Sequence, residues 1–216
     1  GNTAEGDYVA AYPQDVGGHT VYRCSGQAVT ERLGKEAWFI ETLRRELAEG
    51  RNVLVFLWHK ELAARLRLLC ADAGVDDAVV LDANKVPARK RQDWIDKYVV
   101  SQRKRVLITN PTCVQTGLNN LIHFSTAIFF ENPGCSPFVA RQAVGRLDRI
   151  TQTKEVRIYW PVYAGVQCAL LDLLQNKTAI SQQIDGIDPT AALEMAGGGE
   201  ATAQSLDVGM AVYKYL

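Results

Sequence analysis

The sequence predicts an α/β domain in which helices cover both faces of a parallel sheet. Short apolar runs, of the kind found in strands buried on both faces, alternate with longer segments of helical periodicity. This alternation is typical of strand–helix–strand crossovers, which join parallel strands. The chain has 216 residues, of which 47% are hydrophobic, and can therefore bury one sizeable core. One domain with a tail is expected.

The elements follow one another in a regular order. The first helix is expected at 35–49, because its apolar residues recur at helical spacing and Gly50 ends the run. The continuous apolar run at 53–57 predicts a buried strand. The same reasoning gives helices at 61–73, 87–100, 137–147 and 166–184, and strands at 78–81, 105–109, 127–130 and 156–161.

The two ends of the chain differ from this pattern. Residues 1–34 show little periodicity and are expected to form a partly irregular lead-in with one candidate strand at 20–23. The domain is expected to cover 35–190. A stretch rich in glycine and alanine then predicts a flexible linker and a short tail at 191–216.

Charge and cysteine content limit which ligands and which cellular surroundings the sequence predicts. The 24 lysines and arginines balance 24 acidic residues, so any polyanion site must be a local patch. The five cysteines lack Cys-x-x-Cys spacing, which predicts reduced thiols in a cytoplasmic or otherwise intracellular protein and no metal site. The sequence contains neither a signal peptide nor an apolar run long enough to span a bilayer, so no membrane partner is expected.

Residues 142–154 carry the most specific functional signal. Arg146 and Arg149 would share one face if this segment is helical, because they lie three positions apart. Two guanidinium groups aimed together suit a polyphosphate, since each can hold phosphate oxygens bidentately and offset the charge that spreads over them during phosphoryl transfer. A basic surface helix with ordinary ion pairs is the alternative that two arginines alone leave open.

This segment resembles the last conserved motif of superfamily 2 helicases, and of the Swi/Snf-type DNA translocases in particular. That motif reads Gln-Ala-x-Gly-Arg-x-x-Arg-Ile-Gly-Gln-Thr and is followed by a strand. The matching residues are Gln142, Ala143, Gly145, Arg146, Arg149, Ile150, Gln152 and Thr153. Thr151 stands where the family usually has glycine, and Asp148 places a carboxylate between the two arginines. The resemblance implies a RecA-like fold, arginine fingers at Arg146 and Arg149, and a role for Gln142 in orienting the helix or contacting the nucleotide.

Residues 108–119 resemble the fifth motif of the same family. Its first half touches the DNA backbone in relatives, which implies DNA contacts for Asn110 and Thr112. Its end lies near the nucleotide, which implies nucleotide contacts for Gly117 and Asn119. The preceding glycines of the family motif are missing here. A plain strand-to-helix loop with a left-handed glycine is the alternative.

Two further segments are candidates for nucleic-acid binding. Lys60 falls where the family has its fourth motif, and a lysine there could contact a DNA phosphate. Residues 85–105 contain eight basic and two acidic residues, among them Lys85 and Arg91, and Arg91 matches a family arginine at a helix start. The alternatives are a solvated lysine after the strand and an ordinary solvated helix face.

Two elements of a complete ATPase are missing from the sequence. It has no Gly-x-x-x-x-Gly-Lys-Ser/Thr loop, the Walker A sequence, and no Asp-Glu pair after an apolar strand. Both belong to the first RecA-like lobe in the family, so the chain resembles the second lobe alone. The resemblance implies ATP with Mg²⁺ bound mainly by an N-terminal RecA-like lobe of the same parent protein, and a DNA partner that is expected to be duplex. The chain by itself is expected to be inactive.

Two other hypotheses stay open. The first is a non-catalytic DNA- or protein-binding module derived from a degenerate helicase lobe, which Asp148 and Thr151 favour slightly. The second is an RNA helicase lobe, which residues 152–154 and the strand after them fit less well than they fit the DNA translocases.

Overall fold

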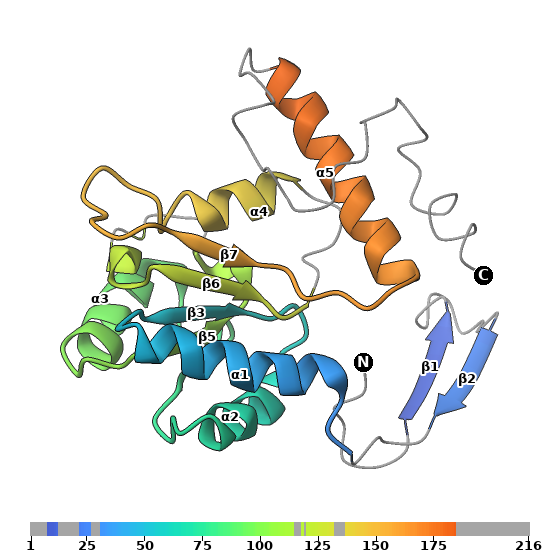
Figure 1. Ribbon diagram of the computed structural model, residues 1–216, viewed down its shortest axis with the longest axis horizontal. Helices are drawn as coiled ribbons and strands as arrows, with labels where there is room; N and C mark the ends of the chain where they lie inside the picture. The colour runs from blue at the N-terminus through green and yellow to red at the C-terminus, as the bar shows by residue number, and fades with distance from the viewer. Residues whose placement is uncertain are drawn as a thin grey trace.

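A five-stranded parallel sheet forms the centre of the protein (Figure 1). The computed structural model describes residues 8–12, 22–26, 31–114, 118, 120–131 and 137–184. The sheet has the order β4-β5-β3-β6-β7, and each pairing between these strands is parallel. Its strands are β3 (Val53–Phe56), β4 (Val79–Leu81), β5 (Val106–Thr109), β6 (Thr126–Phe129) and β7 (Arg157–Tyr159). The predicted α/β class is confirmed.

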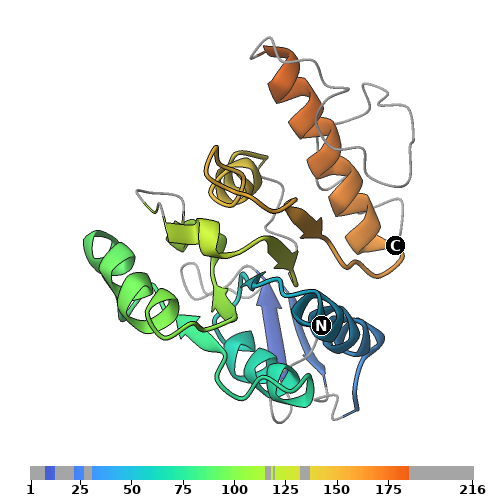
Figure 2. The ribbon, with the colours of Figure 1, turned by 60° about the vertical axis from the view of Figure 1, so that its left-hand side comes forward.

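Helices cover both faces of this sheet (Figures 1 and 2). Val53 and Val55 of the central strand point into a core that they share with α1 (Gly34–Ala48) and α2 (Leu62–Asp72). Leu54 and Phe56 point into a second core on the other face. The helices there are α3 (Arg91–Ile95), a π-helical turn that continues it at Asp96–Val100, and α4 (Pro137–Val144). Strands buried on both faces explain why the sequence shows continuous apolar runs instead of alternation.

The last helix, α5 (Val166–Ile184), has the predicted bounds and packs against α4. Two other helices differ from their predictions. The helix expected at 87–100 is divided into a 3₁₀ turn at Ala88–Lys90, α3 and the π-helical turn. The helix expected at 137–147 ends at Val144. None of the helices in the described part of the chain is long and apolar enough to cross a membrane.

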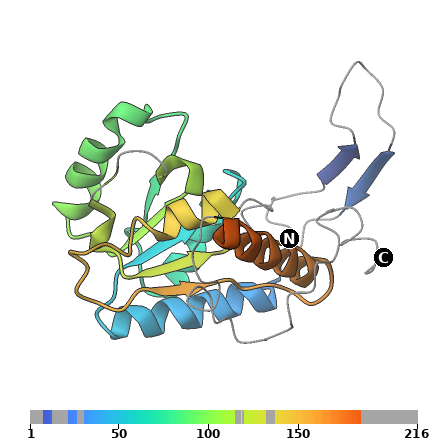
Figure 3. The same cartoon turned by 90° about the horizontal axis from the view of Figure 1, so that it is seen from above.

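A separate antiparallel hairpin stands apart from the large sheet (Figure 3). It pairs β1 (Tyr8–Tyr12) with β2 (Tyr22–Gly26), and Tyr8 lies opposite Gly26. The candidate strand at 20–23 overlaps β2, but sequence reasoning missed β1. The linker and tail expected at 191–216 lie outside the described residues.

A buried carboxylate joins α1 to the last two strands of the sheet. Glu46 is fully buried and accepts hydrogen bonds from Thr126 (2.7 Å) and Tyr159 (2.7 Å). Its oxygens also lie 3.0 Å from Arg51 Nε and 3.3 Å from Arg157 Nη1. Burial by itself would raise the pKa of Glu46, but these hydrogen bonds and the charge of Arg157 outweigh it and lower the pKa.

Candidate nucleotide and nucleic-acid interface

The loops that follow β3, β4 and β5 meet around a pocket of about 390 Å³. Open parallel sheets bind ligands beyond the carboxyl ends of their strands, and this pocket lies at that edge. Lys60, Asn110 and Thr112 line it, so the structure brings together three of the predicted DNA contacts. Lys85 is exposed and follows Asn84, which also lines the pocket.

The turn before Lys60 is fixed from both neighbouring strands. On one side, the Asn110 amide donates to the carbonyl of Trp58 (3.0 Å). On the other side, Glu131 Oε2 accepts hydrogen bonds from the backbone N–H groups of Trp58 (2.7 Å) and His59 (2.8 Å). The second oxygen of Glu131 lies 2.7 Å from His59 Nδ1. The backbone leading to Lys60 is therefore held in place, whereas the Lys60 side chain is exposed.

Asn110 and Thr112 also shape their own loop. Asn110 Oδ1 accepts hydrogen bonds from the backbone N–H (2.9 Å) and the hydroxyl (2.6 Å) of Thr112. This is the local turn that asparagine side chains commonly make with the residue two positions on. Both residues thus have a structural task beside the predicted contact with phosphate.

Arg91 connects two segments that come together at this edge. Its Nε donates to the carbonyl of Val86 (3.2 Å), and its Nη1 donates to the carbonyl of Cys113 (3.2 Å). Arg91 is half-buried, while Lys85, Arg89 and Lys90 are exposed. Among the cations near the start of α3, these three offer more surface to a polyanion, and Arg91 braces the loop that carries Asn110.

The two arginines of the last motif lie in the turn after α4. The expectation that they share one face of a helix therefore does not hold. The helix ends one residue before Gly145, and the backbone continues through helix-like turns, with Leu147 N bonded to Val144 O at 2.9 Å. A side-chain carbon at Gly145 would lie 3.1 Å from the carbonyl oxygen of Arg141, so glycine suits this close approach. Arg146 and Arg149 are both half-buried. We call residues 145–153 the arginine loop.

The arginine loop lies against the fifth-motif segment. Arg149 Nη2 is 3.5 Å from the carbonyl oxygen of Leu118, a long contact that joins the arginine loop to the fifth-motif segment, in which the sequence predicts two nucleotide contacts. Those two residues, Gly117 and Asn119, lie outside the described residues. Gln142 is half-buried on α4.

Gln152 holds the arginine loop to the body of the domain. Its Nε2 lies within hydrogen-bond distance of three carbonyl oxygens, those of Ile122 (3.1 Å), Phe124 (3.0 Å) and Leu147 (3.2 Å). Its Oε1 accepts a hydrogen bond from Lys154 N (3.2 Å). In the sequence, Gln152 matches the family motif, but the motif alone predicts no contact for its side chain.

An open depression of about 860 Å³ borders this loop and is lined by residues 148–152. Ile150 is fully exposed there. Guanidinium groups fit a polyphosphate at this place, whereas the exposed carboxylate of Asp148 would repel one. No group of three or more His, Cys, Asp or Glu side chains in the described ranges is arranged to hold a metal ion.

Solved structures share this architecture. The C-terminal part of the Fun30 ATPase domain superposes with a TM-score of 0.58 at 23% sequence identity, over 66% of this chain and 45% of that chain. The SWI2/SNF2 ATPase core of Sulfolobus solfataricus, solved in complex with dsDNA, gives a TM-score of 0.53 at 20% identity, over 74% of this chain and 33% of that chain. The chain has the fold of a Swi/Snf-type ATPase lobe. The predicted RecA-like fold is confirmed, and the match spans less than half of either solved chain. Comparison of the sequence with family models and with curated proteins gives no match.

Proposed function

We propose that the chain is the second lobe of an ATP-dependent DNA helicase or translocase of the Swi/Snf type. The contact between Arg149 and Leu118 carries the proposal, because it joins the loop of the last motif to the loop of the fifth motif on this fold. A fold alone does not determine function, which depends on the particular residues at the site. The parent protein would hydrolyse ATP, and this lobe alone would not.

On the nucleotide side, Arg146 and Arg149 would contact phosphate groups of ATP held with Mg²⁺ mainly by the absent first lobe. Two guanidinium groups would offset the negative charge that develops during phosphoryl transfer, which is what an arginine finger does. Further contacts with the nucleotide would come from Gln142, Gly117 and Asn119. Gln152 supports this assignment indirectly, because it fixes the loop on which both arginines lie.

On the nucleic-acid side, the partner would be duplex DNA. Lys60 and Lys85 are exposed at the carboxyl edge of the sheet, where cations can approach a phosphate backbone without reading sequence. Asn110 and Thr112 line the same pocket and would add polar contacts. Arg91 would act mainly by holding the Asn110 loop in place.

A non-catalytic binding module is the second candidate. Asp148 favours it, since an exposed carboxylate between the two arginines would weaken their attraction for phosphates. Such a module would still bind DNA at the carboxyl edge of the sheet, but its arginine loop would no longer bind the phosphates of ATP.

The two candidates differ in one assay on the parent protein that contains both lobes. ATP hydrolysis would be measured without nucleic acid, with duplex DNA and with RNA of equal length. Stimulation by duplex DNA is the expected result. Absence of hydrolysis, with DNA binding intact, would favour the binding module, and preferential stimulation by RNA would favour an RNA helicase lobe.

A further inference from the structure

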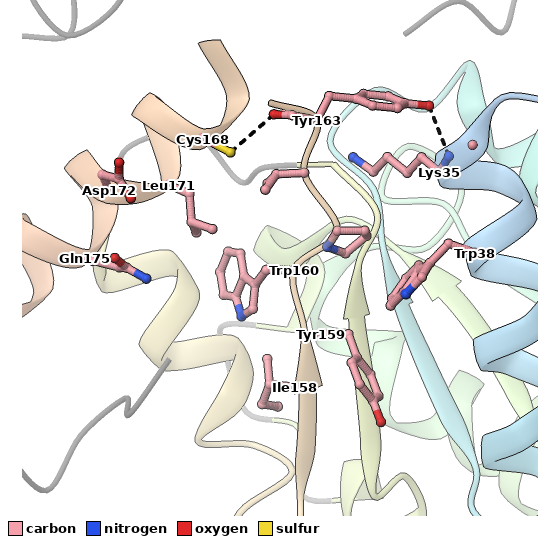
Figure 4. Close-up of a pocket in the computed structure, with 13 residues that line it drawn as sticks. Lys35, Trp38, Ile158, Tyr159, Trp160, Tyr163, Cys168, Leu171, Asp172 and Gln175 are labelled. Carbon is pink, nitrogen blue, oxygen red and sulfur yellow. Dashed lines mark hydrogen bonds between the residues drawn. The ribbon is translucent and has the colours of Figure 1, made fainter. Parts of the chain in front are cut away.

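Another pocket, of about 790 Å³, lies at the carboxyl end of β7 (Figure 4). It is bordered by the first turn of α1, the residues after β7 and the first half of α5. Aromatic side chains form much of its lining, and a lysine, a carboxylate and an amide provide polar groups. These residues are Trp38, Tyr159, Trp160, Tyr163, Lys35, Asp172 and Gln175.

Lys35 is held at this pocket by its surroundings. Its backbone N–H donates to the hydroxyl of Tyr163 (3.1 Å). Its Nζ lies 5.2 Å from the ring centroid of Phe130 and 6.0 Å from that of Tyr163. Figure 4 shows the Lys35 side chain running beneath the Tyr163 ring toward the pocket. Within the described part of the chain, no carboxylate forms an ion pair with Nζ, and Glu131 acts on it only as a nearby charge.

We propose that Lys35 is a nucleophilic modification site that takes up an acyl group from an activated acyl donor such as a thioester. The Nζ lone pair would attack the carbonyl carbon, the C–S bond would break, and the thiolate would leave. The amine would release its protons to solvent, and the product would be a neutral amide. The apolar walls around Trp38 and Trp160 would receive the acyl group. This proposal does not depend on the proposed function.

The protonation state of Lys35 supports this chemistry. Burial lowers the pKa of Lys35 from 10.5 to about 8, although the charge of Glu131 opposes the shift. About a tenth of the amine is therefore neutral at pH 7, which is about 300-fold more than for an ordinary lysine. The other titratable groups that border the pocket are Tyr159 at the end of β7, Tyr163 after that strand, and Cys168 and Asp172 on α5. A less basic amine is also a weaker nucleophile, which reduces the rate advantage of the larger neutral fraction by about tenfold or more.

We expect Lys35 to be acylated about tenfold faster than Lys85 at pH 7. Its larger neutral fraction favours acylation, while its weaker nucleophilicity and its partial burial reduce that advantage. The experiment treats the full chain with substoichiometric S-phenyl thioacetate between pH 6 and pH 10. Acetylation of every lysine is then quantified by peptide mass spectrometry. Lys85 is exposed and serves as the internal control.

The pH profile provides the second readout. The rate at Lys35 in the folded protein should level off above about pH 8.5, while the rate at the same residue in urea-unfolded protein should keep rising to pH 10. In urea the difference between the two sites should vanish, and Lys35→Arg should remove only the Lys35 product. A rate at Lys35 no higher than that at Lys85 at pH 7, or a rate at Lys35 that rises to pH 10 in the folded protein as it does in urea, would overturn the proposal.

Discussion

Replacing Gln152 by glutamate should destabilise the arginine loop. The substitution keeps the size and shape of the side chain but removes the N–H donors that face the carbonyl oxygens of Ile122, Phe124 and Leu147. An amide NH₂ group has two hydrogens, so it makes at most two good hydrogen bonds with these three oxygens at one time. Each such bond contributes about 0.5 to 1.5 kcal/mol.

These values give the expected size of the effect. Gln152→Met removes both donors without adding charge and should lower the free energy of unfolding by about 1 to 3 kcal/mol. Gln152→Glu should cost roughly 1 kcal/mol more at pH 7, because a carboxylate then faces carbonyl oxygens that also carry negative partial charge. When the solution is acidified, the glutamate gains a proton and one donor, so the difference between the two variants should shrink.

Urea unfolding followed by circular dichroism measures the free energy of unfolding for wild type and both variants. The order wild type, Gln152→Met, Gln152→Glu should hold at pH 7, with equal dependence on urea concentration in all three. The reasoning would be refuted if Gln152→Glu were as stable as wild type, or if Gln152→Met were the less stable variant.

Further predictions concern three other places in the chain. Glu46→Gln should lower the free energy of unfolding by about 3 kcal/mol in urea titrations, because it leaves buried arginine charge without its carboxylate. Because the pKa of Glu46 is lowered in the folded state, its carboxylate should stabilise the wild type above its ordinary pKa of 4.5, and this contribution should disappear as the pH falls through the lowered value. Lys60→Ala in the parent protein should weaken duplex DNA binding and reduce the slope of log K against log salt by about 1, and an unchanged slope would argue against a phosphate contact. Burial raises the pKa of Cys70 to about 12, so a thiol reagent should modify half-exposed Cys168 well before Cys70, and equal rates in the folded protein would contradict the described burial.

The fold could be predicted largely because the sheet is buried on both faces. Val53 to Phe56 are all buried, and such a strand needs a continuous apolar run that is visible in the sequence. The bounds of α5 were also predicted correctly. Strand β1 was missed because the apolar run Tyr8–Tyr12 is short and lies in a lead-in that otherwise shows little periodicity.

The candidate site was predictable in position but not in its contacts. The rule that ligands lie beyond the carboxyl ends of parallel strands correctly placed Lys60 and Asn110 at one edge. The tasks of Arg91, Glu131 and Gln152 depend on partners more than twenty residues away in the sequence, and spacing within a motif gives no information about such partners.

The assignment of the arginine loop to phosphate binding is tested most directly in the parent protein that contains both lobes. Arg149→Ala should reduce DNA-stimulated ATP turnover by about a thousandfold or more and leave duplex DNA binding largely intact. Arg149→Lys should recover little of the lost ATP turnover, because a lysine lacks the planar fork of the guanidinium group. Arg141→Ala, which changes an exposed arginine of α4, is the matched control and should retain turnover near that of the wild type. Unchanged ATP turnover in Arg149→Ala would contradict the proposed role of this lobe.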